Sequence, residues 1–193
     1  MHLRSITFTE PLVYGKHEVF AEREVLEFKH PVTLLVGDQG CGKSTLLDIL
    51  ALKHKAKQTL DYDQGVSFYH LDTEKDNPRR KGYIDGKIIG FQLNSMFSSH
   101  GQTILALMKM IEQGKDCLFF IDEPESGLSI RSQFLLLNII NEAVKNNVQF
   151  VIATHSVILI EAQSEVLDLE RRTWCSSEDF ITSQKSLKRK KAK

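Results

Sequence analysis

The 193-residue sequence lacks the features that mark secreted, metal-binding or membrane-spanning proteins. Its three cysteines, Cys41, Cys117 and Cys175, are an odd number at unrelated spacings, so they indicate neither a zinc site nor a disulfide framework. Its apolar runs are far shorter than a membrane span, and its first residues lack the profile of a signal peptide. We therefore expect a cytoplasmic protein with no direct membrane insertion.

The sequence also lacks net charge, because 25 basic residues balance 25 acidic ones. The charges are nevertheless spread unevenly, since residues 185–193 hold six positive charges and no negative one, which leaves −6 on the rest of the chain. Such a run is typical of a disordered, solvated end, and a contact with nucleic acid or another partner is the alternative. The remaining residues, 1–184, suffice for one α/β domain.

The rest of the chain is organised around residues 32–45. An apolar, β-branched run at 32–36 predicts a buried strand, and the eight residues that follow fit the phosphate-binding P-loop pattern. Glycines let successive N–H groups converge on one anion, and the helix expected next presents its positive N-terminal end to the same point. A glycine-rich turn with a chance lysine is the alternative, but strand, loop and helix follow in the required order. The predicted phosphate-binding residues are Gly37, Asp38, Gln39, Gly40, Cys41, Gly42, Lys43, Ser44 and Thr45.

Three of these residues have distinct expected roles. Lys43 would reach the β- and γ-phosphates of a nucleoside triphosphate, and the Ser44 hydroxyl would ligate Mg²⁺. Cys41 lies inside the loop, where backbone N–H dipoles are expected to favour its thiolate. The alternative for Cys41 is a small residue that fills the loop.

Acidic residues and a histidine follow two further apolar runs. Asp122 and Glu123 come directly after the run 117–121, and His155 follows the run 148–153. Ligands bind at the carboxyl edge of open parallel sheets, so these residues are expected near the P-loop. Asp122 fits the Mg²⁺-holding carboxylate, and Glu123 could orient or deprotonate an attacking water. His155 could sense the γ-phosphate, although a histidine at a strand end is often only structural.

Two weaker signals lie elsewhere. Ser99, Gly101 and Gln102 precede the apolar run 104–111, where a serine cap and a nearby glycine would suit a ligand at a helix start, although an ordinary helix cap looks similar. The aromatic residues Phe8, Tyr14 and Phe20 are candidates for stacking on an adenine ring, although such residues more often pack in a core.

The order of apolar patterns predicts an α/β fold. We expect strands at 3–9, 25–28, 32–36, 66–71, 117–121, 148–153 and 166–169, with helices at 46–52, 104–111 and 130–146. This order favours a mostly parallel central sheet flanked by helices, with a small antiparallel β-layer at the N-terminal end.

Together, these motifs resemble those of the ATP-binding-cassette (ABC) class of P-loop NTPases over about residues 3–170. Residues 37–44 match the Walker A motif, 117–123 match Walker B with its catalytic glutamate, and 126–129 match the D-loop. His155 matches the switch histidine, and residues 99–102 resemble the signature motif, with histidine where many relatives carry glycine. The resemblance implies ATP and Mg²⁺ as ligands and roles for Glu123, His155 and Lys43 in catalysis.

The spacing of the motifs is closer to soluble members of the class than to transporter subunits. Ser99 follows Lys43 by 56 positions, which leaves less room than the helical subdomain of a transporter subunit requires. Gln92 is a candidate for the Q-loop glutamine, but it lies only seven residues before Ser99.

In this class the signature motif of one subunit completes the nucleotide site of another. The resemblance therefore implies an ATP-dependent homodimer or oligomer, with Ser99, Gly101 and Gln102 acting across the interface. We expect a soluble, Mg²⁺-dependent ATPase of nucleic-acid repair or defence, with nucleic acid or an effector protein as possible partners. The alternatives are a transporter's nucleotide-binding subunit and a slow ATP-dependent assembly switch.

Overall fold

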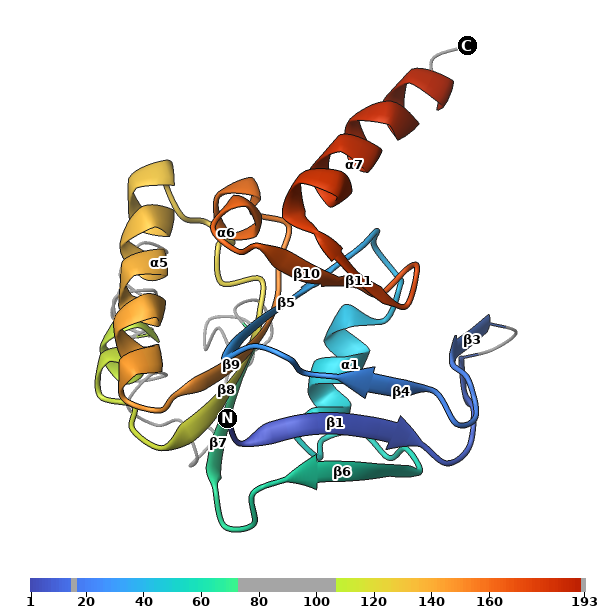
Figure 1. Ribbon diagram of the computed structural model, residues 1–193, viewed down its shortest axis with the longest axis horizontal. Coiled ribbons are helices and arrows are strands. Elements are labelled where there is room, and N and C mark those ends of the chain that lie inside the picture. Colours follow the sequence, from blue (N-terminus) through green and yellow to red (C-terminus); the bar gives the residue numbers. More distant parts are fainter. Residues whose placement is uncertain (15–16, 73–106, 192–193) are drawn as a thin grey trace, which may run out of the picture.

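The computed structural model describes residues 1–14, 17–72 and 107–191, and its centre is a six-stranded sheet (Figure 1). The strand order is β11-β10-β5-β9-β8-β7, in which only the β10–β11 pair is antiparallel. The strands span Val32–Val36 (β5), Ser67–Asp72 (β7), Cys117–Asp122 (β8), Gln149–Ala153 (β9), Glu165–Asp168 (β10) and Thr173–Ser176 (β11). All five parallel strands therefore end at one edge of the sheet.

A smaller antiparallel sheet packs beside the central one. Its order is β4-β1-β6, formed by Val25–Glu27, Leu3–Phe8 and Gln58–Tyr62, respectively. A separate hairpin pairs β2 (Leu12–Tyr14) with β3 (His17–Phe20). The predicted N-terminal antiparallel layer is confirmed, whereas β6 lies in a segment whose polar residues gave no strand pattern.

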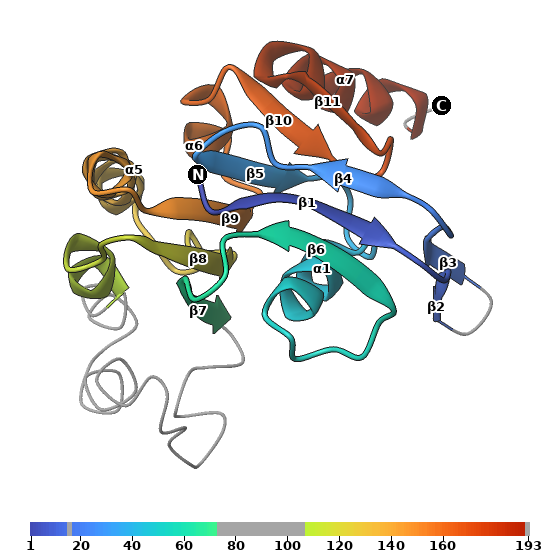
Figure 2. The same ribbon diagram turned by 60° about the horizontal axis from the view of Figure 1, so that its bottom comes forward.

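Helix α1 (Lys43–Leu50) lies between the two sheets (Figure 2). Its buried residues pack with inward-facing residues of β1 and with alternate residues of the central strands, such as Leu118 and Phe120 of β8. Phe8 and Phe20 belong to this core, where their rings stack at a centroid distance of 4.4 Å and are almost fully buried. Because each ring covers the other, neither is free to stack on an adenine.

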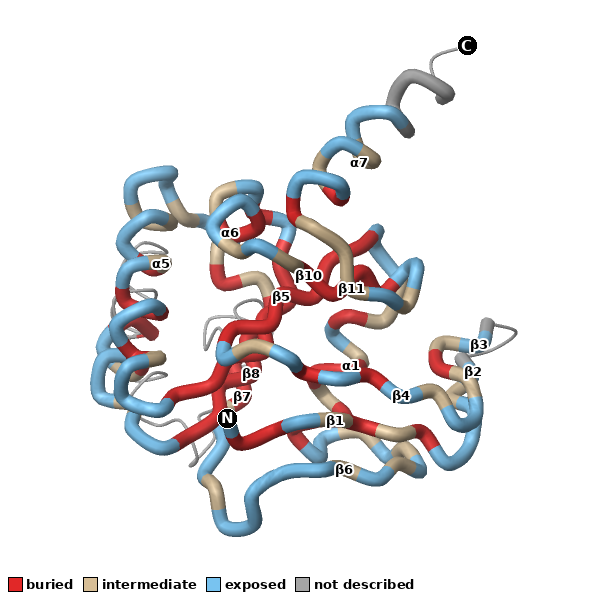
Figure 3. The backbone as a smooth tube through the Cα atoms, in the orientation of Figure 1, coloured by how far each residue is buried: buried red, intermediate tan, exposed pale blue. Residues whose placement is uncertain are grey.

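The other face of the central sheet is covered by α5 (Ile130–Lys145), α6 (Val157–Glu161) and a helical segment at 107–112. The central strands are buried on both faces, as Figure 3 shows, because their alternate side chains enter two different cores. In β8, for example, Phe119 and Ile121 join the core under α5, opposite Leu118 and Phe120. Burial on both faces explains why the sequences of these strands are continuous runs of apolar residues.

The C-terminal helix α7 (Ser177–Lys191) extends into residues 185–193, for which the sequence predicts a disordered end. Its backbone is helical through residues 185–191, and the helix projects away from the body (Figure 1). The helix begins at Ser177 and carries Glu178 and Asp179 in its first turn, where negative charge complements the helix dipole. Within the described part of the chain, no helix is long and apolar enough to cross a membrane.

Candidate nucleotide-binding site

The P-loop runs from the end of β5 into the first turn of α1. Gly37, Gly40 and Gly42 all adopt positive φ angles, of 133°, 84° and 99°. A Cβ at Gly37 would lie 2.8 Å from Cys41 Sγ, and one at Gly42 would lie 2.7 Å from Val19 Cγ1, so side chains are excluded there by space as well as by conformation. Among the described residues, no side chain caps the N-terminus of α1, which leaves its first N–H groups for an anion.

Lys43 folds its side chain back over the loop. Its Nζ donates hydrogen bonds to the carbonyl oxygens of Gly37, at 2.8 Å, and Asp38, at 3.0 Å. The residue is buried, with 6% of its surface exposed, so these two acceptors replace hydrogen bonds that its Nζ would otherwise make with water. The lysine thus holds the loop in a closed turn and keeps a positive charge at its centre.

A cavity of about 460 Å³ opens in front of the loop. Three residues from other segments line it, namely Val19, Glu123 and His155. The rest of its lining comes from the P-loop and the start of α1, namely Gln39, Gly40, Gly42, Lys43, Ser44 and Thr45. Residues predicted from three separate motifs therefore face one space beside the N-terminus of α1.

Cys41 differs from its expected thiolate character. Burial raises the pKa of its thiol, while the positive charges of Lys43 and Arg172 act in the opposite direction. The Lys43 ammonium group, whose Nζ lies 3.9 Å from Sγ, lowers the pKa of the thiol, but by less than burial raises it. The expectation of a thiolate is wrong, because burial inside the loop outweighs the nearby positive charges.

Asp122 and Glu123 lie at the carboxyl end of β8, as predicted. Asp122 is 8% exposed and pairs in register with Asp72 at the end of β7, which is 7% exposed. Glu123 has a φ of 47°, unusual for a residue other than glycine, and its N–H donates to the Ala153 carbonyl at 2.9 Å. This bond ties the Walker B turn to the neighbouring strand and fixes the glutamate at the rim of the cavity.

His155 follows β9 and meets Glu123 across the sheet edge. Its Nε2 lies 3.8 Å from Glu123 Oε1, and both side chains are nearly half exposed. The His155 N–H donates to Glu125 Oε1 at 2.6 Å, which connects this turn to the one after Walker B. The Ser156 hydroxyl then donates to Gln133 Oε1 of α5 at 2.7 Å and caps α6, so His155 is held from both sides.

Several residues at the site carried no recognisable signal in the sequence. Val19 lines the cavity from the β2–β3 hairpin, and Glu125 supports the backbone of His155. Asp72 places a second buried carboxylate beside Asp122. Only the register of β7 against β8 could have indicated this pairing, since the two acids are far apart in the sequence.

The predicted signature residues Ser99, Gly101 and Gln102, like Gln92, lie outside the described residues. The D-loop residues 126–129 are described, and Ser129 there has a structural role. Its hydroxyl accepts a hydrogen bond from the Ser132 N–H at 3.2 Å and so caps α5.

Comparisons with known proteins show which families and folds this chain is similar to. A family model described as "AAA domain, putative AbiEii toxin, Type IV TA system" matches residues 102–161, about a third of the chain. No curated protein matches the sequence.

Two solved structures are similar throughout most of the chain. One is described as "an inward-facing conformation of a putative metal-chelate type ABC transporter", with a TM-score of 0.61, 19% identity, and coverage of 92% of this chain and 84% of that one. The other, a "putative ABC transporter (ATP-binding protein)" from Pyrococcus furiosus, gives a TM-score of 0.54, 16% identity, and coverage of 79% and 92%. The chain therefore has the fold of an ABC/AAA-type P-loop ATPase, as the motifs indicated.

Proposed function

We propose that this protein binds ATP with Mg²⁺ and hydrolyses it. The observation that carries the proposal is the cavity beside α1, in which a buried lysine, three positive-φ glycines and the acid–histidine pair of Glu123 and His155 share one space. The lysine and the helix N-terminus supply positive potential for a polyphosphate. Glu123 supplies the base at the other wall.

The donor set fits Mg²⁺, which prefers oxygen ligands and usually takes only one or two carboxylates alongside phosphate oxygens and water. Ser44 offers a hydroxyl at the cavity, and Asp122 offers a buried carboxylate at the end of the neighbouring strand. The described residues contain no cluster of three acidic, histidine or cysteine side chains, so a metal site made by protein alone is not expected there. When bound with ATP, Mg²⁺ would neutralise charge on the β- and γ-phosphates.

Hydrolysis would proceed by in-line attack of water on the γ-phosphorus, with cleavage of its bond to the β–γ bridging oxygen and departure of ADP. Glu123 would orient this water and accept its proton, while His155, 3.8 Å from the Glu123 carboxylate, would contact the γ-phosphate or the water. Lys43 would move from the Gly37 and Asp38 carbonyls to the phosphates. Positioning and electrostatic stabilisation then account for most of the acceleration.

The protein is further proposed to dimerise on binding ATP, with Ser99, Gly101 and Gln102 of one subunit closing the site of the other. The open cavity supports this proposal, because Glu123 and His155 are both about two-fifths exposed and would need a partner to exclude water. ABC-type structural neighbours are consistent with such an assembly.

The biological setting proposed is cytoplasmic, in nucleic-acid repair or defence, with an effector protein as a possible partner. The matched family model, whose description names a toxin–antitoxin system, favours defence. A transporter's nucleotide-binding subunit is the second candidate, since the structural neighbours are described as ABC transporter proteins. A slow ATP-dependent assembly switch is the third.

These candidates differ in measurable ways. The purified chain should release phosphate from ATP with Mg²⁺ and lose this activity in EDTA, and Asp122→Asn should raise the Mg²⁺ concentration required. Mass photometry with ATP should show dimers that disappear as ATP is consumed. ATP-dependent dimerisation without detectable turnover would instead favour the switch. Co-purification of a membrane protein would favour the transporter subunit.

A further inference from the structure

Two segments distant in the sequence flank the P-loop. The turn between β10 and β11, residues 169–172, lies against the start of the loop, where the Glu170 nitrogen is 3.4 Å from the point that a Cβ of Gly37 would occupy. The β2–β3 hairpin lies against the end of the loop, where Val19 packs on Gly42. The phosphate-binding loop is thus held between a turn and a hairpin.

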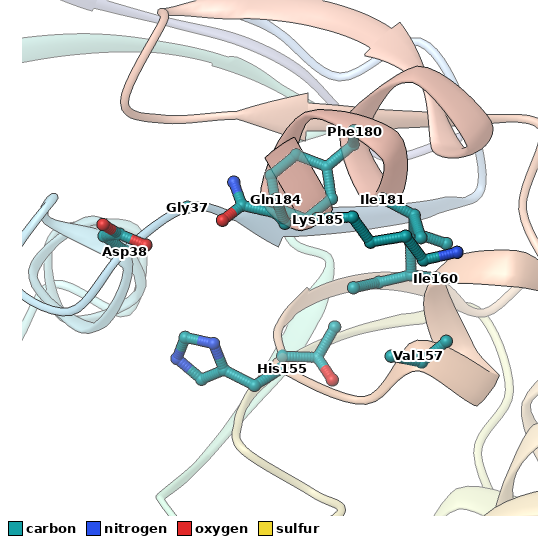
Figure 4. Close-up of a pocket in the computed structure, with 10 residues that line it drawn as sticks. Gly37, Asp38, His155, Val157, Ile160, Phe180, Ile181, Gln184 and Lys185 are labelled. Atoms are coloured by element: carbon teal, nitrogen blue, oxygen red, sulfur yellow. The ribbon is translucent and has the colours of Figure 1, made fainter. Parts of the chain in front are cut away.

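On another side, the P-loop borders open space. A second cavity, of about 390 Å³, lies between the start of the loop and helices α6 and α7. Gly37 and Asp38 line it from the P-loop, and Phe180 and Gln184 line it from α7, as Figure 4 shows. Because open space offers the loop no packing contact, the turn and the hairpin matter more for its support.

The turn is firmly fixed to the central sheet. Asp168, of which 2% is exposed, accepts a hydrogen bond from the Glu170 N–H at 2.9 Å. The Leu169 N–H donates to the Val36 carbonyl at 3.0 Å, which joins the turn to the end of β5. The side chain of Arg172 therefore extends from a backbone that the sheet holds in place.

The hairpin has fewer attachments. Within the described residues, β2 and β3 pair only with each other, and Figures 1 and 2 show them outside both larger sheets. An isolated two-stranded hairpin is marginally stable at best in water. The buried Phe20 ring, stacked on Phe8, anchors one strand. The position of Val19 therefore depends on contacts that other segments supply.

Arg172 connects the fixed turn to this hairpin through three contacts. Its Nη2 donates a hydrogen bond to the Val19 carbonyl, and its Nε lies 3.4 Å from Glu24 Oε1. The guanidinium also covers the Phe20 ring, with Cζ 4.6 Å from the ring centroid. Only 30% of the Arg172 side chain and 14% of the Glu24 side chain are exposed, so water weakens these contacts less than it would at a free surface.

Val19 is the point at which these contacts reach the nucleotide cavity. Of the described residues that line the cavity, Val19 has the one apolar side chain. Lys43, Glu123 and the helix N-terminus suit phosphates and water, whereas the sugar and base are the parts of ATP that gain from an apolar contact. We therefore expect the nucleoside to lie against Val19.

We propose that Arg172 is a positioning residue for nucleotide binding, which holds Val19 beside the P-loop and thereby sets the affinity for the nucleoside part of ATP. This role rests on the proposed ATP function. Arg172 is not among the described residues that line the nucleotide cavity, so it acts through the hairpin.

Calorimetry with two ligands, Mg-ATP and inorganic tripolyphosphate, locates the effect. Arg172→Gln should weaken ATP binding about tenfold, the lower end of the effect expected for a lost hydrogen bond to a charged group. Its affinity for tripolyphosphate should stay at the parental value, because a bare triphosphate has no nucleoside to meet Val19. In turnover assays its KM for ATP should rise while kcat is retained.

Two further variants serve as controls. Arg172→Lys should recover part of the ATP affinity, because it restores a cation beside Glu24 and Phe20. Arg171→Gln removes the same charge from the same turn, but Arg171 is half exposed and faces Asp168, at 3.7 Å, rather than the hairpin. This variant should keep both affinities, and a loss equal to that of Arg172→Gln would mean that only charge matters.

The outcomes for Arg172→Gln distinguish the hairpin from the P-loop. Equal weakening of ATP and tripolyphosphate would show that Arg172 supports the P-loop itself and would overturn its action through the hairpin. Parental affinity for ATP would overturn the positioning role altogether. In a Val19→Ala background, Arg172→Gln should weaken ATP binding little further, and additive losses would refute transmission through Val19.

Amide hydrogen exchange tests the clamp without nucleotide. Residues 17–20 should exchange faster in Arg172→Gln than in the parent or in Arg171→Gln, because the hairpin opens more often. Unchanged exchange would refute the clamp. Faster exchange in Arg172→Gln, together with a parent that fails to bind ATP, would instead contradict the proposed function while supporting the clamp.

Discussion

Gly42→Ala is expected to destabilise the protein through two separable effects at the P-loop. The first is conformational, since Gly42 has a φ of 99° and a residue with a Cβ held there costs about 1–3 kcal/mol. The second is steric, since the new Cβ would lie 2.7 Å from Val19 Cγ1, and such overpacking costs about 1–3 kcal/mol. The free energy of unfolding should therefore fall by roughly 2–6 kcal/mol.

The steric part can be isolated, because it depends on one side chain. Val19→Ala removes the methyl group that the new Cβ would meet, whereas the contacts with the Phe20 ring, at 3.5 and 3.8 Å, are ordinary. The loss of unfolding free energy in the double variant should thus be smaller, by about 1–3 kcal/mol, than the sum of the losses in the two single variants. The cost of holding alanine at the positive φ of position 42 should remain in the double variant.

Urea unfolding of the parent, both single variants and the double variant would measure this interaction energy. A control cycle that combines Val19→Ala with Gly65→Ala should be additive, since Gly65 also has a positive φ but no atom of the described residues lies within 4 Å of the point that its Cβ would occupy. Additivity within about 0.5 kcal/mol for Gly42 and Val19 would refute the contact between the hairpin and the P-loop.

Other expectations concern reactivity, assembly and support of the site. Because burial raises the Cys41 pKa, less thiolate is present at pH 7 than for a free thiol. Labelling of Cys41 by a maleimide, followed by mass spectrometry, should therefore be slow at pH 7 and accelerate as the pH rises. Mg-ATP should block this labelling. Equal labelling with and without nucleotide would contradict this. Lys43→Ala and Ser99→Arg should each abolish ATPase activity, and mixing the two proteins should restore it if Ser99 acts across a dimer; activity of Ser99→Arg alone would make Ser99 only a helix cap. Glu125→Ala should lower turnover about tenfold by removing the acceptor of the His155 N–H, whereas Glu125→Gln, which keeps an acceptor, should lower it less; equal kinetics of the two variants would refute this role.

The parts of the fold that could be predicted are those with strong local patterns. The strands β5, β8 and β9 are buried on both faces, so their apolar runs were legible without knowledge of their neighbours. Strand β6, with the sequence Gln-Thr-Leu-Asp-Tyr, owes its conformation to pairing with β1 rather than to its own residues. Helix α7 was missed because its basic end resembles a solvated tail, while one buried residue, Phe180, anchors its start.

The candidate site likewise contains residues that local sequence patterns predict and residues that they do not. The P-loop, Glu123 and His155 were identified because each follows an apolar strand in a fixed motif, and the structure brings them around one cavity. Val19 and Glu125 act through contacts with residues distant in the sequence, so no local pattern revealed them. For Cys41, the expected direction of the pKa shift was wrong because burial depends on packing around the loop.

The central claim is that Lys43 holds the nucleotide and Glu123 hydrolyses it. The most direct measurement compares ATP affinity by calorimetry with single-turnover phosphate release, in the parent, Lys43→Ala and Glu123→Gln. Glu123→Gln should bind ATP as the parent does and hydrolyse it about 10²–10⁴-fold more slowly, the usual loss when a general base is removed. Lys43→Ala should fail to bind. Parental hydrolysis by Glu123→Gln, or parental affinity in Lys43→Ala, would contradict the account.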